Sequence, residues 1–584
     1  MKLSTAITAL VAQAFMALAS SSCRCFPGDS CWPSNSTWAT LNSTVGGRLV
    51  ATVPMGSPCH DPNYNATECA LLQSQWTLPE LYLSSSSSVM QPYFANQSCD
   101  AFTPESQPCL LGNYVRYAIN VSTVDDVIAG VNFAQENNIR FVIRNTGHDF
   151  LGRSTGAGAL SVWTHYLKDI EYPVWSDQYY QGQAIKVGAG IEGYEILEAA
   201  SAKGLVVVSG ECPTVGLAGG FTQGGGHSAL STSFGLAADQ TLEFEVVTAS
   251  GELVTASRTE NADLYWALSG GGGGNYGVVV SMTVKAHPDA MIGGAGLQFA
   301  AAYTTSDLFY QAVSEFHALL PAMIDNGTMV VYYFNDAYFI INPITAYNQT
   351  SAQVQAILSP FVSVLNNLSI PFEVAYTEFA TYEEHYNTYM GPLPYGNIGV
   401  AEYQFGSRLI PRSVVEDNNA ALQVALRNVT ENGVLIVGVA VDVSAPVKSG
   451  NVSNAVLPAW RETLVHATLT TAWNSTAPWS DMVKQQELMT DEYVPQLESV
   501  TPGSGSYMNE ADFRQPNFQE VFFGDNYAAL LVIKEKWDPN SLFYAVKAVG
   551  SKSFVLRRAA IGGDYVDFIS SLSSTLAKPS NPRA

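Results

Sequence analysis

Two glycine-rich segments lie within residues 184–280: AIKVGAGIEGYEILEAASAKGLVVVSGECPTVGLAGGFTQGGGHS at 184–228 and DLYWALSGGGGGNYGVVV at 263–280. Glycines on this scale, set between β-branched runs, indicate backbone that passes very close to another group. Around them, apolar runs predict strands near 140–144, 158–163 and 185–187, and helices over 125–137 and 194–202. We therefore expect an α+β fold with several short sheets.

A second sheet is predicted further along, where glycine becomes scarce between about residues 288 and 501. The segments MVVYYF (329–334), YFIINP (338–343) and VLIVGVAVDV (434–443) are typical of strands, and 413–427 has the spacing of an amphipathic helix. The pattern changes again near residue 507, before a helix over 527–536 that ends at Trp-Asp-Pro. A chain of 584 residues is long enough for two or three such domains.

The N-terminus has the pattern of a secretory signal peptide at 1–19, with one lysine, a short apolar run and a small-residue cleavage site. No later run of 18 or more apolar residues follows, so no membrane span is expected. Eleven N-x-S/T sequons agree with export, and none lies between residues 121 and 325. The formal charge of −24 argues against nucleic acid or an anionic membrane as a partner. We expect a soluble, secreted glycoprotein.

Seven of the eight cysteines lie in the first 109 residues, in a segment rich in Ser, Pro and Asn that we expect to be loop-rich and disulfide-bonded. Seven is odd, so parity allows three bridges with one thiol left over, or four bridges if Cys212 takes part. Cys212 stands alone in the glycine-rich region. It is either an apolar filler or a chemically used thiol.

One common nucleotide-binding motif occurs in the chain. Residues 188–193 match G-x-G-x-x-G between a strand and a helix, which a dinucleotide-binding unit or a tight packing turn would both explain. No G-x-x-x-x-G-K-[ST] or G-x-S-x-G motif occurs, so a P-loop or a serine-hydrolase elbow is not expected. His148, His165 and His227 do not have metal-ligand spacing, and no metal is predicted.

Two reactive side chains are flanked by glycine. His148 lies in RNTGHDFLGRSTG (144–156), and Cys212 lies in GECPTVG (210–216). Glycine-rich loops expose backbone N–H groups that can bind a pyrophosphate without net positive charge. An imidazole and a thiolate are also the side chains best suited to bond an electrophilic ring.

At these residues the chain resembles the berberine-bridge-enzyme-like branch of the vanillyl-alcohol-oxidase flavoprotein family. The resemblance rests on RNTGHDFLGRSTG, GECPTVGLAGGFTQGGGHS (210–228), DLYWALSGGGGGNYGVV (263–279), YMNEAD (507–512) and NYAALLVIKEKWDPNSLF (526–543). The stretch CRCFPGDSCWPSNSTWATLN (23–42) looks like the N-terminal cap of secreted fungal members described as isoamyl-alcohol-oxidase-like.

The resemblance implies an α+β fold with a PCMH-type FAD-binding domain of two α/β subdomains and a substrate domain whose antiparallel sheet is flanked by helices. The implied boundaries are 1–19 for the signal peptide, 20–112 for the Cys-rich extension, 113–290 for the FAD-binding domain, 291–500 for the substrate domain, 501–560 for the C-terminal segment that returns to the FAD domain, and 561–584 for a tail.

The resemblance also implies FAD held by two covalent bonds, from His148 to the flavin 8α-methyl and from Cys212 to C6. Cys212 would then be used by flavin, leaving one spare thiol among the seven N-terminal cysteines. The remaining residues implied to bind the cofactor are Arg144, Asn145, Thr146, Gly147, Gly152, Arg153, Ser154, Val215, Gly216, Gly220, Gly225, Gly226 and Asn509. Val215 is either a small residue that lets oxygen reach the reduced flavin or an ordinary core valine.

The chain departs from the family pattern at Glu510, where many relatives carry a catalytic tyrosine, although Tyr507 and Asn509 match. A carboxylate in a partly apolar site could act as a general base with a raised pKa. It could equally be a structural acid. We expect Glu510 and Tyr507 to be the catalytic residues.

The implied activity is that of an oxidase that transfers hydride from an alcohol or a hydroxylated, polyketide-like metabolite to flavin N5, with O2 as acceptor. The alternatives are an oligosaccharide oxidase and a non-catalytic exported glycoprotein that keeps flavin structurally. The sequence does not define the oligomeric state.

Overall fold

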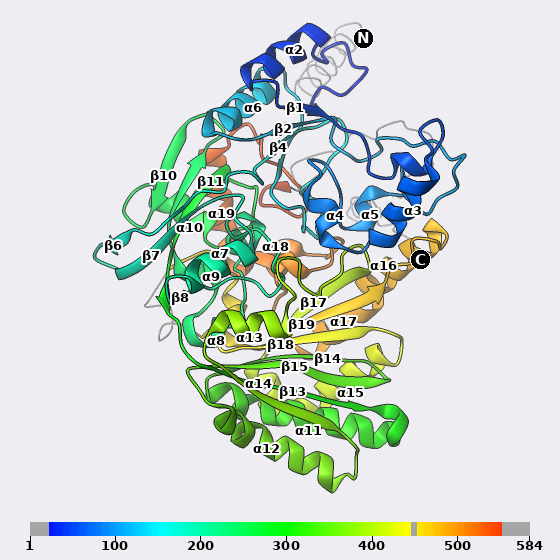
Figure 1. Ribbon diagram of the computed structural model, residues 1–584, viewed down its shortest axis with the longest axis vertical. Helices are drawn as coiled ribbons and strands as arrows, with labels where there is room; N and C mark the ends of the chain where they lie inside the picture. Colours follow the sequence, from blue (N-terminus) through cyan, green and yellow to red (C-terminus); the bar gives the residue numbers. More distant parts are fainter. Residues whose placement is uncertain (1–22, 445–452, 552–584) are drawn as a thin grey trace, which may run out of the picture. The chain divides into compact units, whose positions relative to one another are not determined.

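The computed structural model describes residues 23–444 and 453–551 (Figure 1). The predicted signal peptide (1–19) and tail (561–584) lie outside the described residues. Among the residues described, no helix combines the length and the apolar character needed to cross a bilayer.

The first sheet has four strands in the order β1-β2-β4-β3. β2 (Tyr117–Asn120), β4 (Leu160–Trp163) and β3 (Phe141–Arg144) are parallel, and β1 (Leu49–Ala51) pairs antiparallel with β2. Helix α6 (Val124–Glu136) connects β2 to β3 and packs so closely that a side chain at Gly130 would lie 2.9 Å from Val162. The predicted helix and both predicted strands are confirmed here.

The second sheet has six strands, with β10-β9-β11-β7-β5 in order and β6 paired to β7. All of these pairs are antiparallel. The elements of this part of the chain are β5 (Ile170–Glu171), β6 (Val174–Ser176), β7 (Gln181–Gly188), α7 (Gly193–Ser201), β8 (Leu205–Val206), η2 (Leu217–Phe221), α8 (Ser231–Phe234), α9 (Ala237–Gln240), β9 (Thr241–Val247), β10 (Leu253–Ser257), α10 (Ala262–Leu268) and β11 (Val278–Lys285).

The third sheet is antiparallel and has seven strands in the order β16-β13-β15-β14-β18-β19-β17. Its strands are β13 (Ile292–Ala300), β14 (Thr328–Phe334), β15 (Tyr338–Tyr347), β16 (Glu373–Phe379), β17 (Tyr403–Pro411), β18 (Leu435–Ala440) and β19 (Thr463–Ala472). Helices α11 (Ser306–Asp325), α12 (Ser351–Asn367) and α15 (Asn419–Thr430) lie on one face (Figure 1). The antiparallel, helix-flanked sheet expected from the sequence is confirmed.

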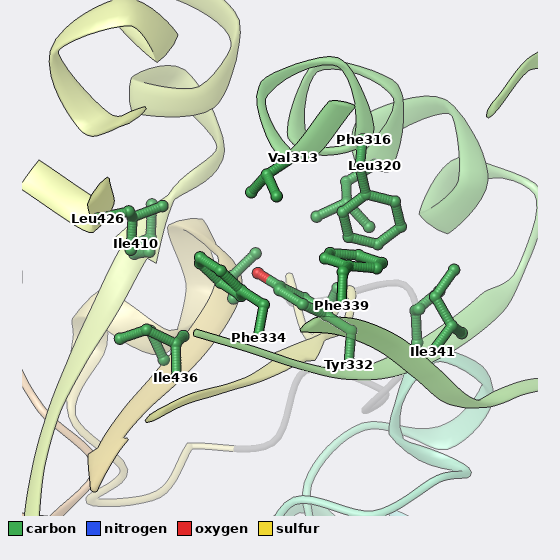
Figure 2. Close-up of a cluster of buried hydrophobic side chains, with 14 of the residues drawn as sticks. Val313, Phe316, Leu320, Tyr332, Phe334, Phe339, Ile341, Ile410, Leu426 and Ile436 are labelled. Atoms are coloured by element: carbon green, nitrogen blue, oxygen red, sulfur yellow. The ribbon is translucent and has the colours of Figure 1, made fainter. Parts of the chain in front are cut away.

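Strand alternation decides what each face of this sheet contacts. Tyr332, Phe334 and Phe339 point toward the helices and pack against Phe316 and Leu320 of α11 in a closed apolar core (Figure 2). Tyr333 points to the other face. The predicted helix at 413–427 is in fact two helices, because the backbone of Asn418 leaves the helical region between α14 (Arg412–Asp417) and α15.

The N-terminal extension is more ordered than a loop-rich segment. It contains α2 (Asn35–Thr44), α3 (Ala66–Gln75), α4 (Pro79–Leu83) and α5 (Pro92–Ala95). Disulfides join Cys25 to Cys31, Cys59 to Cys69 and Cys99 to Cys109. They account for six of the seven N-terminal cysteines, and Cys212 belongs to none of them.

The C-terminal segment packs against the glycine-rich run 270–274. It contains η6 (Met508–Glu510), α18 (Phe518–Phe523) and α19 (Tyr527–Trp537), and α19 lies beside α10. The buried Lys534 donates from Nζ to the carbonyl oxygens of Asn275 and Phe543 and pairs with Asp538 at 2.6 Å. Two segments far apart in sequence are therefore joined at one ammonium group.

Candidate active site

The G-x-G-x-x-G turn at 188–193 is a packing device. A side chain at Gly190 would collide with the carbonyl of His165. The amides of Gly193 and Tyr194, which open α7, already donate to carbonyl oxygens of the Cys212 loop at 2.9 and 2.8 Å. β7 is also antiparallel to its neighbours, whereas a dinucleotide unit needs parallel strands. The dinucleotide interpretation is wrong, and the tight-turn interpretation is confirmed.

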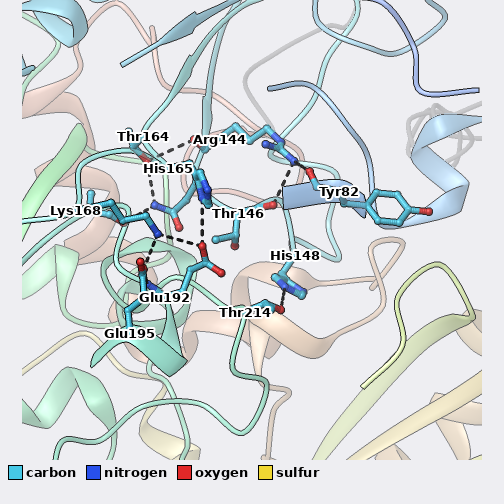
Figure 3. Close-up of polar contacts among 12 residues, drawn as sticks. Tyr82, Arg144, Thr146, His148, Thr164, His165, Lys168, Glu192, Glu195 and Thr214 are labelled. Atoms are coloured by element: carbon cyan, nitrogen blue, oxygen red, sulfur yellow. Dashed lines mark hydrogen bonds and ion pairs between the residues drawn. The ribbon is translucent and has the colours of Figure 1, made fainter. Parts of the chain in front are cut away.

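His148 and Cys212 meet at one hydroxyl group. His148 Nε2 lies 2.8 Å from Thr214 Oγ1 (Figure 3), and Cys212 Sγ lies 3.5 Å from the same oxygen. His148 follows β3, whereas Cys212 follows β8. The fold therefore places both side chains at one edge of the glycine-rich region, as attachment to a single ring requires.

The two side chains differ in readiness to react. Burial, reinforced by Arg144, lowers the pKa of His148 to about 4, so its ring is neutral and keeps a lone pair. Burial raises the pKa of the Cys212 thiol, although hydrogen bonds from Thr214 oppose this. Because the thiolate is the nucleophile, Cys212 must lose a proton before it bonds, whereas His148 need not.

Arg144 anchors the loop that carries His148. Its Nη2 donates to Ser88 Oγ at 2.7 Å and to the carbonyl oxygens of Tyr82 and Thr146, both at 3.2 Å (Figure 3). Gly147 has φ 94° and lies so close that a side chain there would meet the guanidinium. Ser88, at the end of the serine run 84–88, therefore holds the guanidinium that anchors the His148 loop, a contact that the low complexity of the run did not predict.

Asn145 holds the neighbouring turn. Its Nδ2 donates to Thr164 Oγ1 at 3.0 Å and to the carbonyl of Ala189. Its Oδ1 lies against Gly216, where any side chain would collide with it. Asn145 and Gly216 are thus brought together.

The residues after His148 form a closed turn. The Asp149 carboxylate accepts hydrogen bonds from the backbone amides of Arg153 and Ser154. Gly152 has φ 73° and lies against an aromatic ring. The Arg153 guanidinium donates to the carbonyl of Lys547 at 2.9 Å, so this side chain reaches the C-terminal segment.

Asn509 connects the C-terminal segment to the glycines that follow Cys212. Its Nδ2 donates to the carbonyl of Gly220 at 2.8 Å and lies 2.7 Å from the Tyr507 hydroxyl. Gly225 and Gly226 both have positive φ, at 124° and 75°. No atom lies within 4 Å of the point where a side chain on Gly220 would begin, so open space adjoins this backbone.

These segments fit a large polar cofactor. Several buried polar atoms have no hydrogen-bond partner in the described part of the chain: Arg144 Nε and Nη1, Asn145 Oδ1, Ser209 Oγ, Gln223 Oε1 and Asn275 Oδ1. Buried groups of this kind are costly unless another molecule satisfies them. FAD offers ring carbonyls, hydroxyls and phosphates as partners, and His148 and Cys212 stand at the edge of the same region. The residues present therefore fit FAD.

Glu510 lies between two histidines. Its Oε1 is 2.9 Å from His227 Nε2, and its Oε2 is 2.8 Å from His466 Nε2 and 3.3 Å from Thr468 Oγ1. Its side chain is 30% exposed, whereas those of His227 and His466 are 8% and 0% exposed. Two buried imidazoles thus hold a carboxylate that still has an open side.

The charges in this cluster are set by pairing. Burial would raise the pKa of Glu510, but His227 and His466 lower it well below its ordinary value. Burial would lower the pKa of His227, but Glu510 and Glu211 raise it to about 10. Burial lowers the pKa of His466. The raised carboxylate pKa that one of the two interpretations of Glu510 assumed is not found, because the imidazoles outweigh the apolar surroundings.

The sequence did not identify this cluster. His227 has no metal-ligand spacing that would point to a role, and His466 lies in no motif. The available signal was a histidine inside the apolar strand TLVHATLTTA, since a buried imidazole needs a partner. The ligand atoms of His227, His466 and Glu510 lie within 4.8 Å of one another, which suits a metal, but each carboxylate oxygen is already at hydrogen-bond distance from one imidazole.

Tyr507 packs against the two histidines that hold Glu510. It is buried, and its ring centroid lies 5.4 Å from those of both His227 and His466. Burial raises the pKa of its hydroxyl, which is engaged with Asn509.

Comparisons with known proteins agree with these features. Residues 115–257 match the model of the FAD binding domain, and residues 506–550 match that of berberine and berberine-like proteins. The chain is 56% identical to the FAD-linked oxidoreductase ZEB1 of Gibberella zeae, over 91% of this chain and 93% of that protein. It is 50% identical to the FAD-linked oxidoreductase patO of Aspergillus clavatus, over 91% and 92% of the two chains.

A solved structure shows the same fold. The crystal structure of the VAO-type flavoprotein MtVAO615 from Myceliophthora thermophila C1 superposes with a TM-score of 0.88 at 41% identity, covering 91% of this chain and 97% of that one. Together with the FAD-binding and berberine-like matches, this similarity shows that the chain is an FAD-linked oxidoreductase of the VAO-type, berberine-bridge-enzyme-like flavoprotein family.

Proposed function

We propose that this protein is a secreted flavoprotein oxidase that oxidises the carbinol carbon of an alcohol or hydroxylated secondary metabolite. The observation that carries the proposal is the ionised, partly exposed Glu510, held between His227 and His466 in an FAD-linked oxidoreductase. When bound, FAD supplies the hydride acceptor and passes the electrons to O2, which gives hydrogen peroxide. Glu510 accepts the hydroxyl proton.

His148 and Cys212 hold the cofactor by two covalent bonds in this proposal. Support comes from their shared approach to Thr214 Oγ1. Asn509 and the glycines at 216, 220, 225 and 226 line the remaining contacts, and Arg144 and Asn145 offer unpartnered polar atoms. Val215 is half-buried beside this loop, and its small size favours access of O2.

The substrate preference follows from strand register. Residues directly opposite one another share a face of the sheet. Thr468, which contacts Glu510, is paired with Val437, and Val437 is paired with Tyr333. The next position along β19, Thr470, is paired with Leu435 and Phe405.

These apolar side chains are only half-buried, although they lie on the face that carries Glu510's partners. Tyr333, Leu435, Val437 and Phe405 therefore offer an apolar wall beside the acid–base cluster. Such a wall favours an alcohol on a hydrophobic skeleton over an oligosaccharide, because burial of apolar area supplies the binding energy.

Secretion is supported by the three disulfides, which form and persist in oxidising compartments. The sequons at Asn326, Asn367 and Asn474 are exposed and open to glycosylation.

The test is an anaerobic stopped-flow screen of hydrophobic alcohols, phenolic alcohols and oligosaccharides for bleaching of the flavin. Reduction by hydrophobic alcohols, followed by peroxide formation on admission of O2, is expected. Reduction by sugars alone would favour the oligosaccharide alternative. A protein bleached by none of the panel would support a structural role for flavin.

A further inference from the structure

Four side chains form a continuous series of acid and base groups that begins in the loop containing Cys212. Glu211 Oε1 lies 3.7 Å from His227 Nδ1, His227 Nε2 lies 2.9 Å from Glu510 Oε1, and Glu510 Oε2 lies 2.8 Å from His466 Nε2. Glu211 precedes Cys212 directly in the sequence. The chain thus runs from the attachment loop, through the GGGHS segment and η6, to β19.

We propose that His227 is a positioning residue that keeps Glu510 in its carboxylate form, and that Glu211 sustains this by pairing with the far side of the His227 ring. The inference rests on the proposed function, since it concerns the base of that reaction. It adds two residues to which the sequence pattern assigned no role.

The geometry gives each member a distinct part. His227 has one ring nitrogen toward each carboxylate, so an imidazolium can face both at once. His227 Nδ1 and Glu211 Oε1 are both buried, and among residues 23–444 and 453–551 neither has a hydrogen-bond partner other than this approach to the other. Without a positive ring between them, the largely buried Glu211 carboxylate and the partly exposed Glu510 carboxylate would be left near one another.

The other groups around His227 do not supply a competing charge. The rings of Tyr507, Trp460 and His466 lie 5.4, 6.4 and 5.5 Å from that of His227. The carboxylates of this cluster also interact electrostatically with Tyr333, Tyr382 and Cys212. Burial raises the pKa of each of these three groups, which keeps them neutral. Burial likewise lowers the pKa of His466 and keeps it neutral. Among these groups, His227 is therefore the cation that faces Glu211 and Glu510.

Proton balance explains why two carboxylates are useful. Before reaction, the His227 imidazolium faces two anions. When the substrate O–H bond breaks and the proton forms a new O–H bond on Glu510, the charge of Glu510 is lost while hydride leaves for the cofactor. The imidazolium still faces the Glu211 carboxylate, so proton transfer does not leave an isolated buried cation.

A substrate-free experiment tests this arrangement. The flavin-loaded protein, with 15N-labelled histidine, is titrated by NMR between pH 5 and 11, and His227 is assigned from the spectrum of His227→Gln. His227 should remain an imidazolium above pH 8, when burial keeps six other rings neutral, those of His148, His165, His287, His317, His385 and His466. A His227 ring that is neutral at pH 7 would overturn the proposal.

Charge variants separate positioning from simple packing. Glu211→Gln should lower the titration midpoint of His227 by about 1 unit or more, and Glu211→Asp should restore part of the shift. The matched control is Glu373→Gln, an exposed carboxylate on β16, which should leave the midpoint unchanged. Equal effects of Glu211→Gln and Glu373→Gln would refute the role of Glu211.

A kinetic arm links the chain to catalysis. With an alcohol that bleaches the wild-type flavin, His227→Gln should shift the acid limb of the reduction-rate profile upward by about 1 unit or more, because Glu510 loses its cationic partner. An unshifted limb would overturn the proposal. Absence of any bleaching alcohol would instead count against the proposed function, while the NMR result still decides the inference. A stoichiometric transition metal, whose removal by a chelator abolishes reduction, would also overturn it.

Discussion

His148 and His227 each lie in a glycine-flanked loop and are both largely removed from solvent, yet their protonation states are opposite. Burial and the nearby Arg144 lower the pKa of His148 to about 4. Burial acts in the same direction on His227, but Glu510 and Glu211 reverse it and raise the pKa to about 10. The first imidazole is left as a nucleophile, and the second is left as a fixed positive charge.

The difference teaches that burial keeps an enclosed histidine neutral here unless nearby carboxylates outweigh it, as Glu510 and Glu211 do at His227. His165 makes the same point, because it lies only 3.4 Å from Glu192 and still has a pKa lowered to about 4. Burial is the main cause, and Lys168 adds to it while pairing with Glu192 itself at 3.1 Å (Figure 3). In these sites, a carboxylate raises the pKa of an imidazole only where no other cation pairs with that carboxylate.

The largest expected effect comes from removing the negative charge of Glu510, which the His227 imidazolium stabilises. Glu510→Gln should slow flavin reduction by a factor of order 100 or more, because the amide cannot accept the substrate proton. Anaerobic stopped-flow measurement of the reduction rate checks this. A near-normal rate would assign the base elsewhere and leave Glu510 a structural acid.

The role of His148 as a nucleophile is tested with variants of the two residues proposed to bond the flavin, His148 and Cys212. Cys212→Ala should retain flavin through His148 but with a shifted absorption spectrum, whereas the double variant with His148→Ala should lose its yellow colour on acid precipitation. The wild-type precipitate should stay yellow. An unchanged spectrum in Cys212→Ala would contradict the bond from sulfur.

The positive charge of His227 predicts that the free energy of unfolding depends on pH. His227 has a folded-state pKa of about 10, above its ordinary value of 6.5, so its contribution is fully present below pH 6.5 and is lost as the pH rises toward 10. One proton corresponds to a slope of at most about 1.4 kcal/mol per pH unit. Unfolding by denaturant between pH 6 and 10 measures it. His227→Gln should flatten the curve, and an equally steep curve would exclude His227 as its source.

The smallest effect concerns the support of the His148 loop. Ser88→Ala removes the acceptor that lies 2.7 Å from Arg144 Nη2 and should lower the free energy of unfolding by about 1–3 kcal/mol, as for hydrogen bonds to charged groups. The exposed Ser36→Ala on α2 is the control. Equal stability of the two variants would show that the serine run merely fills space.

Local sequence patterns were sufficient for much of the fold. The spacing of apolar residues placed α6, α7 and α19 and the strands β3, β4, β7 and β14 within a few residues of their observed ends. The same reasoning missed the helices of the N-terminal extension. Their apolar face is short, and their stability comes from disulfides and from contacts with distant segments, such as Tyr82 and Ser88 with Arg144.

The candidate site divides in the same way. The sequence by itself determined the glycine-flanked His148 and Cys212 and the departure at Glu510, because these lie in contiguous motifs. Only the tertiary structure decided that His227 and His466 converge on Glu510 and that Glu211 faces the other side of His227. Glu211 and His227 come from separate loops, Glu510 from η6 and His466 from β19. Charge states depend on distances that such separated segments acquire only when the chain folds, and this is why the sequence left open a raised carboxylate pKa where folding lowers it.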